Sequence, residues 1–308
     1  MPSLRDMRLQ IRSVKNISQV TRALEAVSAS KVRKAQQAVL ATRQYAAKAL
    51  QILQHLSEQP GNMASLHPLL QTRREVRNVT IVVYTSDRGL CGAYNTNVLR
   101  LALNFARDQS VPVRFVAVGR KGRDLLVRRR QNVVAEFIGL PNTPSFKDIA
   151  PIGRLLIDDF LSGRTDRVVL AYTDFISMIR QEPRIGQVLP LQPESEYARE
   201  AAGEARVRGP LAAYIYEPSQ EQLLDIIIPR FTQLQVYQAL LESQASEHAA
   251  RMTAMRNATD NAKDLIASLQ LQYNKARQLA ITSDMLDIAG GAEALAKAEQ
   301  SSLFSRHD

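Results

Sequence analysis

The hydrophobic pattern of the last third of the chain is that of one long helix. From Pro229 onward there is no further proline, and the first glycine is Gly290. Steps of three and four residues meet mostly apolar positions, which is typical of a helix with a seam for a partner helix. The Gly290–Gly291 pair predicts its end, because glycine readily adopts the left-handed cap conformation. The predicted seam comprises Leu234, Tyr237, Leu241, Gln244, His248, Arg251, Met255, Ala258, Ala262, Leu265, Leu269, Gln272, Ala276, Leu279, Ser283 and Leu286.

A second long helix is predicted at the start of the chain, from Leu4 to about Leu56. Ser3 can cap it, and Asp6 stands in the capping-box position. After Val14 the apolar stripe resumes at Ile17, so we expect the seam to slip around the helix there. Two long helices at opposite ends of one chain pair most simply in antiparallel. The predicted stripe comprises Leu4, Met7, Ile11, Val14, Ile17, Val20, Leu24, Val27, Val32, Ala35 and Val39.

Between these helices, short β-branched runs alternate with helical segments. Strands are predicted at residues 76–85, 113–118, 133–138, 168–173, 185–189 and 212–216, and helices at 95–108, around 120–130, at 146–161 and at 221–228. Such alternation predicts a mainly parallel sheet with helices on its faces. We therefore predict an α/β fold: a long antiparallel coiled coil of the terminal helices with an inserted Rossmann-like α/β domain. The expected boundaries are 1–58 and 219–295 for the coil, 72–218 for the inserted domain, and 296–308 for a disordered extension.

The charge is concentrated in the first helix. The chain has a formal net charge of +10, and its first 50 residues hold ten Lys and Arg residues against only Asp6 and Glu25. Such a surface suits nucleic acid, anionic lipid or an acidic protein. A single cysteine excludes an internal disulfide and a cysteine zinc cluster. The sequence has neither a long enough apolar run for a membrane span nor the pattern of a secretory signal.

No catalytic set is evident in the sequence. The loop from Ser86 to Ala93 follows the first strand, where α/β proteins often bind ligands. Its glycines, Gly89 and Gly92, are three residues apart, which fits neither the dinucleotide fingerprint nor the phosphate loop. Cys91 is interpreted as a packing thiol. We therefore expect no catalytic residue, cofactor or metal site. Three classes stay open: a coiled-coil mechanical or interaction protein, a basic coiled-coil nucleic-acid-binding protein, and an α/β enzyme with a helical arm.

Four stretches narrow this choice. They are SLRDMRLQIRSVKNISQVTRALEAVSASKVRKAQ (3–36), TSDRGLCGAYNTNV (85–98), YIYEPS (214–219) and RMTAMRNATDNAKDLIASLQLQYNKARQLAITSDMLDIAGGAEAL (251–295). In these, and over nearly its whole length, the chain resembles the gamma subunit of the rotary proton-translocating ATP synthase. The resemblance implies a central-stalk rotor with no active site of its own. Such a rotor is expected to couple proton-driven rotation of the membrane ring to conformational changes in the catalytic hexamer. The implied partners are the alpha and beta subunits, the epsilon subunit and the membrane ring of c subunits, and not nucleic acid.

The resemblance also implies roles for individual residues. Arg277, Gln278 and Thr282 match the polar positions that touch the beta-subunit catch, and Tyr216 and Glu217 match positions near the membrane ring. Asp284 and Asp287 depart from the glutamates usual in the family. The implied location is the cytoplasmic face of the bacterial plasma membrane, as a peripheral subunit. Axle residues expected to face the beta subunits are Arg8, Arg12, Leu24, Lys31 and Arg33.

Overall fold

The computed structural model describes residues 3–57, 67–192 and 220–304. The chain forms two compact units, residues 1–24 with 255–308 and residues 25–254. Two long helices, α1 (Leu4–Ser57) and α7 (Gln220–Phe304), contribute to both units. Ser3 caps α1 as predicted: its hydroxyl donates to Asp6, and its oxygen accepts from the backbone N–H of Asp6.

The unit of residues 25–254 is built on a five-stranded sheet. The strands are β1 (Val79–Tyr84), β2 (Val113–Val118), β3 (Val133–Phe137), β4 (Arg167–Phe175) and β5 (Gln181–Leu189), in the order β3-β2-β1-β4-β5. The first four are parallel and β5 is antiparallel to β4. The prediction of an α/β fold with a mainly parallel sheet is therefore confirmed. The strand predicted at residues 212–216 lies outside the described residues.

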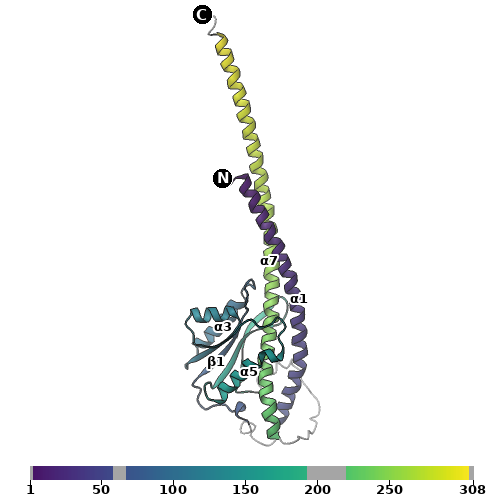
Figure 1. The fold of residues 1–308 in the computed structure, drawn as a ribbon, viewed down its shortest axis with the longest axis vertical. Coiled ribbons are helices and arrows are strands. Elements are labelled where there is room, and N and C mark those ends of the chain that lie inside the picture. Colours follow the sequence, from purple (N-terminus) through teal and green to yellow (C-terminus); the bar gives the residue numbers. More distant parts are fainter. Residues whose placement is uncertain (1–2, 58–66, 193–219, 305–308) are drawn as a thin grey trace. The chain divides into compact units, whose positions relative to one another are not determined.

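Helices cover both faces of this sheet (Figure 1). α3 (Tyr94–Arg107) and α4 (Arg120–Arg128) pack their apolar sides on one face, where Leu99 and Leu126 join the core around Ile81. α5 (Phe146–Leu161) packs on the other face. A 3₁₀ turn, η1 (Pro68–Leu70), precedes β1 and closes one corner of that second core.

α7 completes the second face of the sheet. The Tyr84 hydroxyl of β1 donates to the carbonyl of Val236 over 2.9 Å, and the Ser246 hydroxyl donates to the carbonyl of Thr173 in β4. The helix passes through Pro229 without ending. One face of the α/β unit is thus closed by a helix that also enters the other unit. The α7 side chains buried in this core are Leu224, Ile228, Phe231, Leu234, Val236, Ala239 and Leu240.

The buried stripe of α1 does not slip, so that prediction is wrong. Buried and half-buried positions continue in steps of three and four, through polar residues after Val14. Ile17, Val20 and Val27 are each more than half exposed. Hydrophobicity alone misses this register because small hydroxyl side chains also fit a tight helix contact and bond locally to backbone carbonyls. The observed stripe is Leu4, Met7, Ile11, Val14, Ser18, Thr21, Glu25, Ser28, Val32, Ala35, Val39 and Thr42.

In the unit of residues 1–24 and 255–308, α1 and α7 pair in antiparallel. The Thr21 and Thr259 hydroxyls lie 2.7 Å apart, and Arg8 Nε donates to the Tyr273 hydroxyl over 2.7 Å, so α1 positions rise as α7 positions fall. From Met255 to Leu279 the predicted α7 seam is right at every second position and wrong by one residue at the others; Leu265 and Leu279, for example, are exposed. The last two predicted positions, Ser283 and Leu286, are also exposed and lie beyond the end of the seam. The observed seam is Met255, Thr259, Ala262, Ile266, Leu269, Tyr273, Ala276 and Ala280.

α7 does not end at the glycine pair. It continues through Gly290 and Gly291 to Phe304, into the segment predicted to be disordered. A glycine inside a helix costs about 1 kcal/mol relative to alanine, and the neighbouring alanines favour helix, so two glycines do not suffice to stop it. Residues 281–294 are all exposed.

The predicted and the observed stripes of α1 both contain Val32, but only the predicted stripe contains Val20. Val32 is fully buried, whereas Val20 is 58% exposed. We expect Val32→Ala to lower the free energy of unfolding of the full chain by about 2 kcal/mol. Val20→Ala should leave it unchanged or slightly higher, since alanine is the better helix former. Urea unfolding followed by circular dichroism measures both free energies. Equal losses of stability in the two variants would show that Val20 is buried, as the predicted stripe requires.

Candidate functional site

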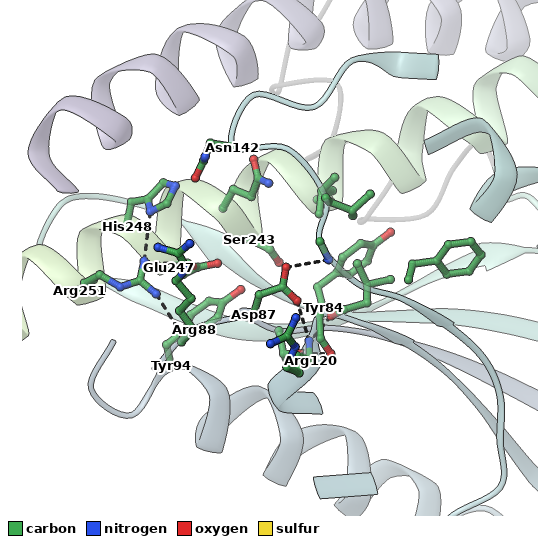
Figure 2. A pocket seen from close by; sticks show the side chains of 18 of the residues that line it. Tyr84, Asp87, Arg88, Tyr94, Arg120, Asn142, Ser243, Glu247, His248 and Arg251 are labelled. Atoms are coloured by element: carbon green, nitrogen blue, oxygen red, sulfur yellow. Dashed lines mark hydrogen bonds and ion pairs between the residues drawn. The ribbon is translucent and has the colours of Figure 1, made fainter. Parts of the chain in front are cut away.

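A charged pocket lies in the α/β unit at the carboxyl ends of β1, β2 and β3. Its volume is about 390 Å³, and α1 and α7 form its far wall (Figure 2). In open α/β sheets this edge is the usual place for a ligand. The side chains that carry charge into it are Lys31, Asp87, Arg88, Arg120, Glu247 and Arg251.

The anion position at this edge is filled by the chain itself. The Asp87 carboxylate accepts hydrogen bonds from the backbone N–H groups of Arg120 and Gly139, over 2.8 and 2.9 Å. The Thr85 hydroxyl oxygen accepts from the N–H of Gly122, also in the first turn of α4. The N-terminus of a helix attracts anions because its free N–H groups point outward. Here Asp87 and Thr85 occupy those groups, so a phosphate cannot use them without displacing the loop.

Arg251 of α7 fastens the loop after β1. Its Nη2 donates to the carbonyls of Arg88 and Gly89 over 3.3 Å each, and its Nη1 lies 2.8 Å from Oε1 of Glu247. The ion pair is largely buried, which makes removal of either partner costly. At Gly92 of the same loop, φ is +57° and an added Cβ would lie 4.0 Å from the Cβ of Ala254. The loop is therefore tied to α7 through its backbone, independently of most of its side chains.

The bonds from Arg251 to the loop carbonyls and to Glu247 are here called the clamp. Burial governs the protonation of the groups beside this clamp. Burial raises the pKa of Glu247, and the guanidinium of Arg251 opposes that rise. Burial, with Arg251 and Lys31 nearby, lowers the pKa of His248 to about 4. His248 is therefore neutral at pH 7, and its Nδ1 lies 3.3 Å from Nη1 of Arg251. Burial also raises the pKa of Tyr94 well above its ordinary range.

The pocket offers cations but no catalytic set. Arg88 and Arg120 lack a carboxylate partner among the described residues, and Lys31 donates to the side-chain oxygen of Asn142 over 2.8 Å. Cys91 is buried and accepts a hydrogen bond from Asn95, as expected of a packing thiol. Within residues 3–57, 67–192 and 220–304, no group of His, Cys, Asp and Glu could hold a metal ion. Among the charged side chains that line the pocket, Lys and Arg outnumber the carboxylates by four to two.

The residues expected on the axle fall in different surroundings. Lys31 lines the pocket, Leu24 is half-buried, and Arg12 and Arg33 are exposed. Arg8 is held across the seam by Tyr273, over whose ring its guanidinium lies at 5.3 Å. Of the basic residues expected on the axle, Arg8 and Lys31 are therefore hydrogen-bonded within the chain, whereas Arg12 and Arg33 are exposed.

The residues expected at the beta-subunit catch are all exposed. Arg277, Gln278 and Thr282 lie outside the seam that Ala276 and Ala280 form. Tyr216 and Glu217, expected near the membrane ring, lie outside the described residues.

Sequence reasoning missed the clamp and one exposed residue of the loop. Glu247 and Arg251 stand four residues apart on a helix, a spacing that signals an ion pair, but Arg251 was placed in the seam. Leu90 was not singled out, although it is 66% exposed and has φ of +64°. A leucine rarely adopts that conformation, and it is held there by the bonds on either side. No sequence pattern predicts this conformation of Leu90.

The fold defines a protein of two long helices that pair in antiparallel, with an α/β unit between them in the sequence. A family model described as ATP synthase matches residues 3–295. The ATP synthase gamma chain of Dehalococcoides mccartyi strain CBDB1 is 47% identical over 296 residues, which cover 96% of this chain and all of the relative. That of Roseiflexus castenholzii is 47% identical over 300 residues, with the same coverage. The chain belongs to the ATP synthase gamma chain family.

Solved structures share the fold. A chain of the Euglena gracilis mitochondrial ATP synthase, in a structure of its OSCP, F1 and c-ring, matches with a TM-score of 0.65 at 20% identity; the match covers 96% of this chain and 95% of that one. A chain from the central stalk and c-ring of the Tetrahymena thermophila mitochondrial enzyme matches with a TM-score of 0.57 at 24% identity, covering 78% and 99%. No helix in the described part of the chain is long and apolar enough to cross a membrane.

The low pKa of His248 predicts an acid-dependent loss of stability. In the unfolded chain, His248 binds a proton below about pH 6.5, whereas in the folded chain it stays neutral until about pH 4. Stability from this group is therefore present above pH 6.5 and is lost as the pH falls toward 4, by about 2 kcal/mol at pH 5. His248→Gln should remove this contribution to the dependence of the free energy of unfolding on pH.

Urea unfolding of both proteins at pH 7 and pH 5 measures this difference. The raised pKa of Glu247 acts in the opposite direction, but it does so in both proteins and cancels in the comparison. If the two proteins lose equal stability between pH 7 and pH 5, the histidine is not held neutral by its surroundings.

Proposed function

We propose that this chain is the central-stalk rotor subunit of an ATP synthase, in which α1 and α7 form the axle. It couples proton-driven rotation of a membrane ring of c subunits to conformational changes at the catalytic sites of an alpha/beta hexamer. The observation that carries the proposal is the full-length relation to gamma chains at 47% identity. A nucleic-acid-binding function has no support from these relatives.

The surface of the paired helices supports an enclosing partner. Their seam is filled within the chain, yet apolar side chains such as Ile17, Val20 and Val27 of α1 point outward. Exposed apolar surface of this extent marks an interaction site. Beyond the last seam residue, Ala280, the outward apolar residues of α7 are Ile281, Met285, Leu286 and Ile288.

The proposed partners follow from the relation to ATP synthase gamma chains. The alpha and beta subunits surround the axle, and acidic loops of the beta subunits meet Arg8, Arg12, Leu24, Lys31 and Arg33. Each face of the axle stabilises one conformation of the subunit it meets, and this difference in contact energy couples rotation to nucleotide affinity. Epsilon and the c-ring contact the α/β unit, the ring near Tyr216 and Glu217. The complex sits on the cytoplasmic face of the bacterial plasma membrane, with this chain as a peripheral subunit.

The catch is proposed to be Arg277, Gln278 and Thr282. Gln278 and Thr282 lie four residues apart, hence on one face of α7, and both are exposed. We expect Gln278→Ala with Thr282→Ala to lower multisite ATP turnover of the reconstituted complex severalfold. Its assembly and the melting temperature of the chain should stay nearly unchanged, since exposed polar groups contribute little to folding.

Gln270→Ala with Asn274→Ala is the matched control. These two residues are also exposed and four apart on α7, and their side chains are hydrogen-bonded to each other. Turnover should be close to wild type in this variant. A control that loses as much turnover as the catch variant would show that the effect is not specific to Gln278 and Thr282.

The isolated chain should neither bind nor hydrolyse ATP. Asp87 and Thr85 occupy the N–H groups that would receive a phosphate. Among the described residues, no group of three or more His, Cys, Asp and Glu side chains could hold a metal ion. Isothermal titration of the purified chain with ATP and Mg²⁺ should give no saturable heat, and a phosphate-release assay no turnover. A stoichiometric micromolar site would contradict a purely mechanical role.

A further inference from the structure

The end of α4 carries three consecutive exposed arginines. Arg128 is the last residue of α4, and Arg129 and Arg130 follow it; the three are here called the arginine corner. The buried side of the helix is formed by Gly122 and Leu126. Their side chains make no ion pair or hydrogen bond with any other described residue. Three neighbouring uncompensated charges attract anions more strongly than scattered ones do.

Arg130 occupies a position that folding alone would give to glycine. Its φ is +55°, and its N–H donates to the carbonyl of Val127 while the N–H of Gln131 donates to that of Leu126. This is the Schellman closure of a helix, whose left-handed residue is usually glycine because a Cβ clashes there. The arginine is therefore kept against a conformational preference, and nothing inside the described chain uses its charge.

The arginine corner lies at the amino-terminal edge of the sheet. It leads into β3, and Asn132 just beyond it accepts a hydrogen bond from the first part of β2 through the N–H of Phe115. Other exposed arginines stand at this edge: Arg74 before β1, Arg107 before β2 and Arg164 before β4. Arg107 and Arg164 are paired with Asp108 and Asp159, so of these three only Arg74 adds a charge without a carboxylate partner among the described residues. The uncompensated positive charge of this edge is therefore concentrated at the arginine corner.

α7 starts at this same edge. Asp225, in its second turn, lies 3.6 Å from Nε2 of His67, which precedes β1, whereas Arg251 meets the loop at the opposite edge. In the proposed function, on which this inference rests, the residues just before α7 adjoin the membrane ring. The arginine corner therefore points toward the membrane. It lies on the face of the sheet opposite to α7, away from the axle helices.

We propose that the arginine corner binds the anionic phospholipid headgroups of the membrane surface. Guanidinium groups match phosphate geometry and are less strongly hydrated than ammonium groups. Attraction to an anionic leaflet acts only within about 10 Å, so the contact is salt-sensitive. It is a sliding contact, because headgroups exchange freely as the rotor turns.

The test uses the complex assembled from this chain with alpha, beta and epsilon subunits, in which the basic axle is enclosed. Its sedimentation with vesicles of phosphatidylcholine is compared with that of mixed phosphatidylcholine and phosphatidylglycerol. The triple variant Arg128→Gln, Arg129→Gln and Arg130→Gln should bind the mixed vesicles roughly 30-fold to 100-fold more weakly than the wild type. The matched control, Arg100→Gln, Lys147→Gln and Arg154→Gln, removes the same charge from exposed positions of α3 and α5 and should bind like the wild type.

Arg130→Gly separates charge from folding. Glycine fits the left-handed position better, so the melting temperature of the chain should stay or rise, while vesicle binding falls about threefold to fivefold. Equal binding by the triple variant and the wild type would overturn the proposal, as would equal losses in the triple and control variants. Loss of epsilon from the triple variant would overturn it in favour of an acidic protein partner. Failure of the complex to form would contradict the proposed function; a complex that forms but binds both vesicles alike contradicts only the lipid contact.

Discussion

The sheet has only one complete cover of its own. α3 and α4 close one face, but the other face is closed jointly by α5 and by seven side chains of α7. Apolar strand residues such as Leu170 and Tyr84 lie against that helix and would otherwise meet water. Burial of such residues is the main stabilising term in folding, so the α/β unit cannot be stable without α7. In this unit, α7 and the sheet therefore form one folded body.

The polar seam gives the paired helices a fixed register. An apolar seam tolerates sliding by one repeat, because one leucine replaces another at little cost, whereas the hydroxyl pair of Thr21 and Thr259 has only one matching position. Arg8 with Tyr273 adds a second matched pair fourteen α7 residues away, two full heptads. A rotor that transmits torque needs this property more than it needs maximal stability. Small polar residues in the seam are therefore suited to the function and not a weakness of the coil.

Periodicity and alternation in the sequence were sufficient to predict the fold, but not the seam. The strands were found because β-branched runs such as that around Ile81 are dense and short. The seam was misplaced because apolar residues mark both the buried stripe of α1 and the outward positions Ile17 and Val20, which need a second protein to be covered. The arginines and glutamine assigned to partner contacts came from family resemblance. The clamp of Arg251 on two backbone carbonyls leaves no mark in the sequence, since any loop offers carbonyls.

The shared core also sets an order of events on the ribosome. All five strands and α5 are synthesised before the first residue of α7 exists. At ~5–20 residues per second, several seconds pass between the end of β5 and the arrival of Leu240. During that interval the face of the sheet around Tyr84 stays exposed to solvent. It offers a binding surface to any chaperone that recognises apolar strands. Nascent gamma chains should therefore depend on such protection up to their last third, and truncated products that stop before α7 should be removed by proteases and not accumulate.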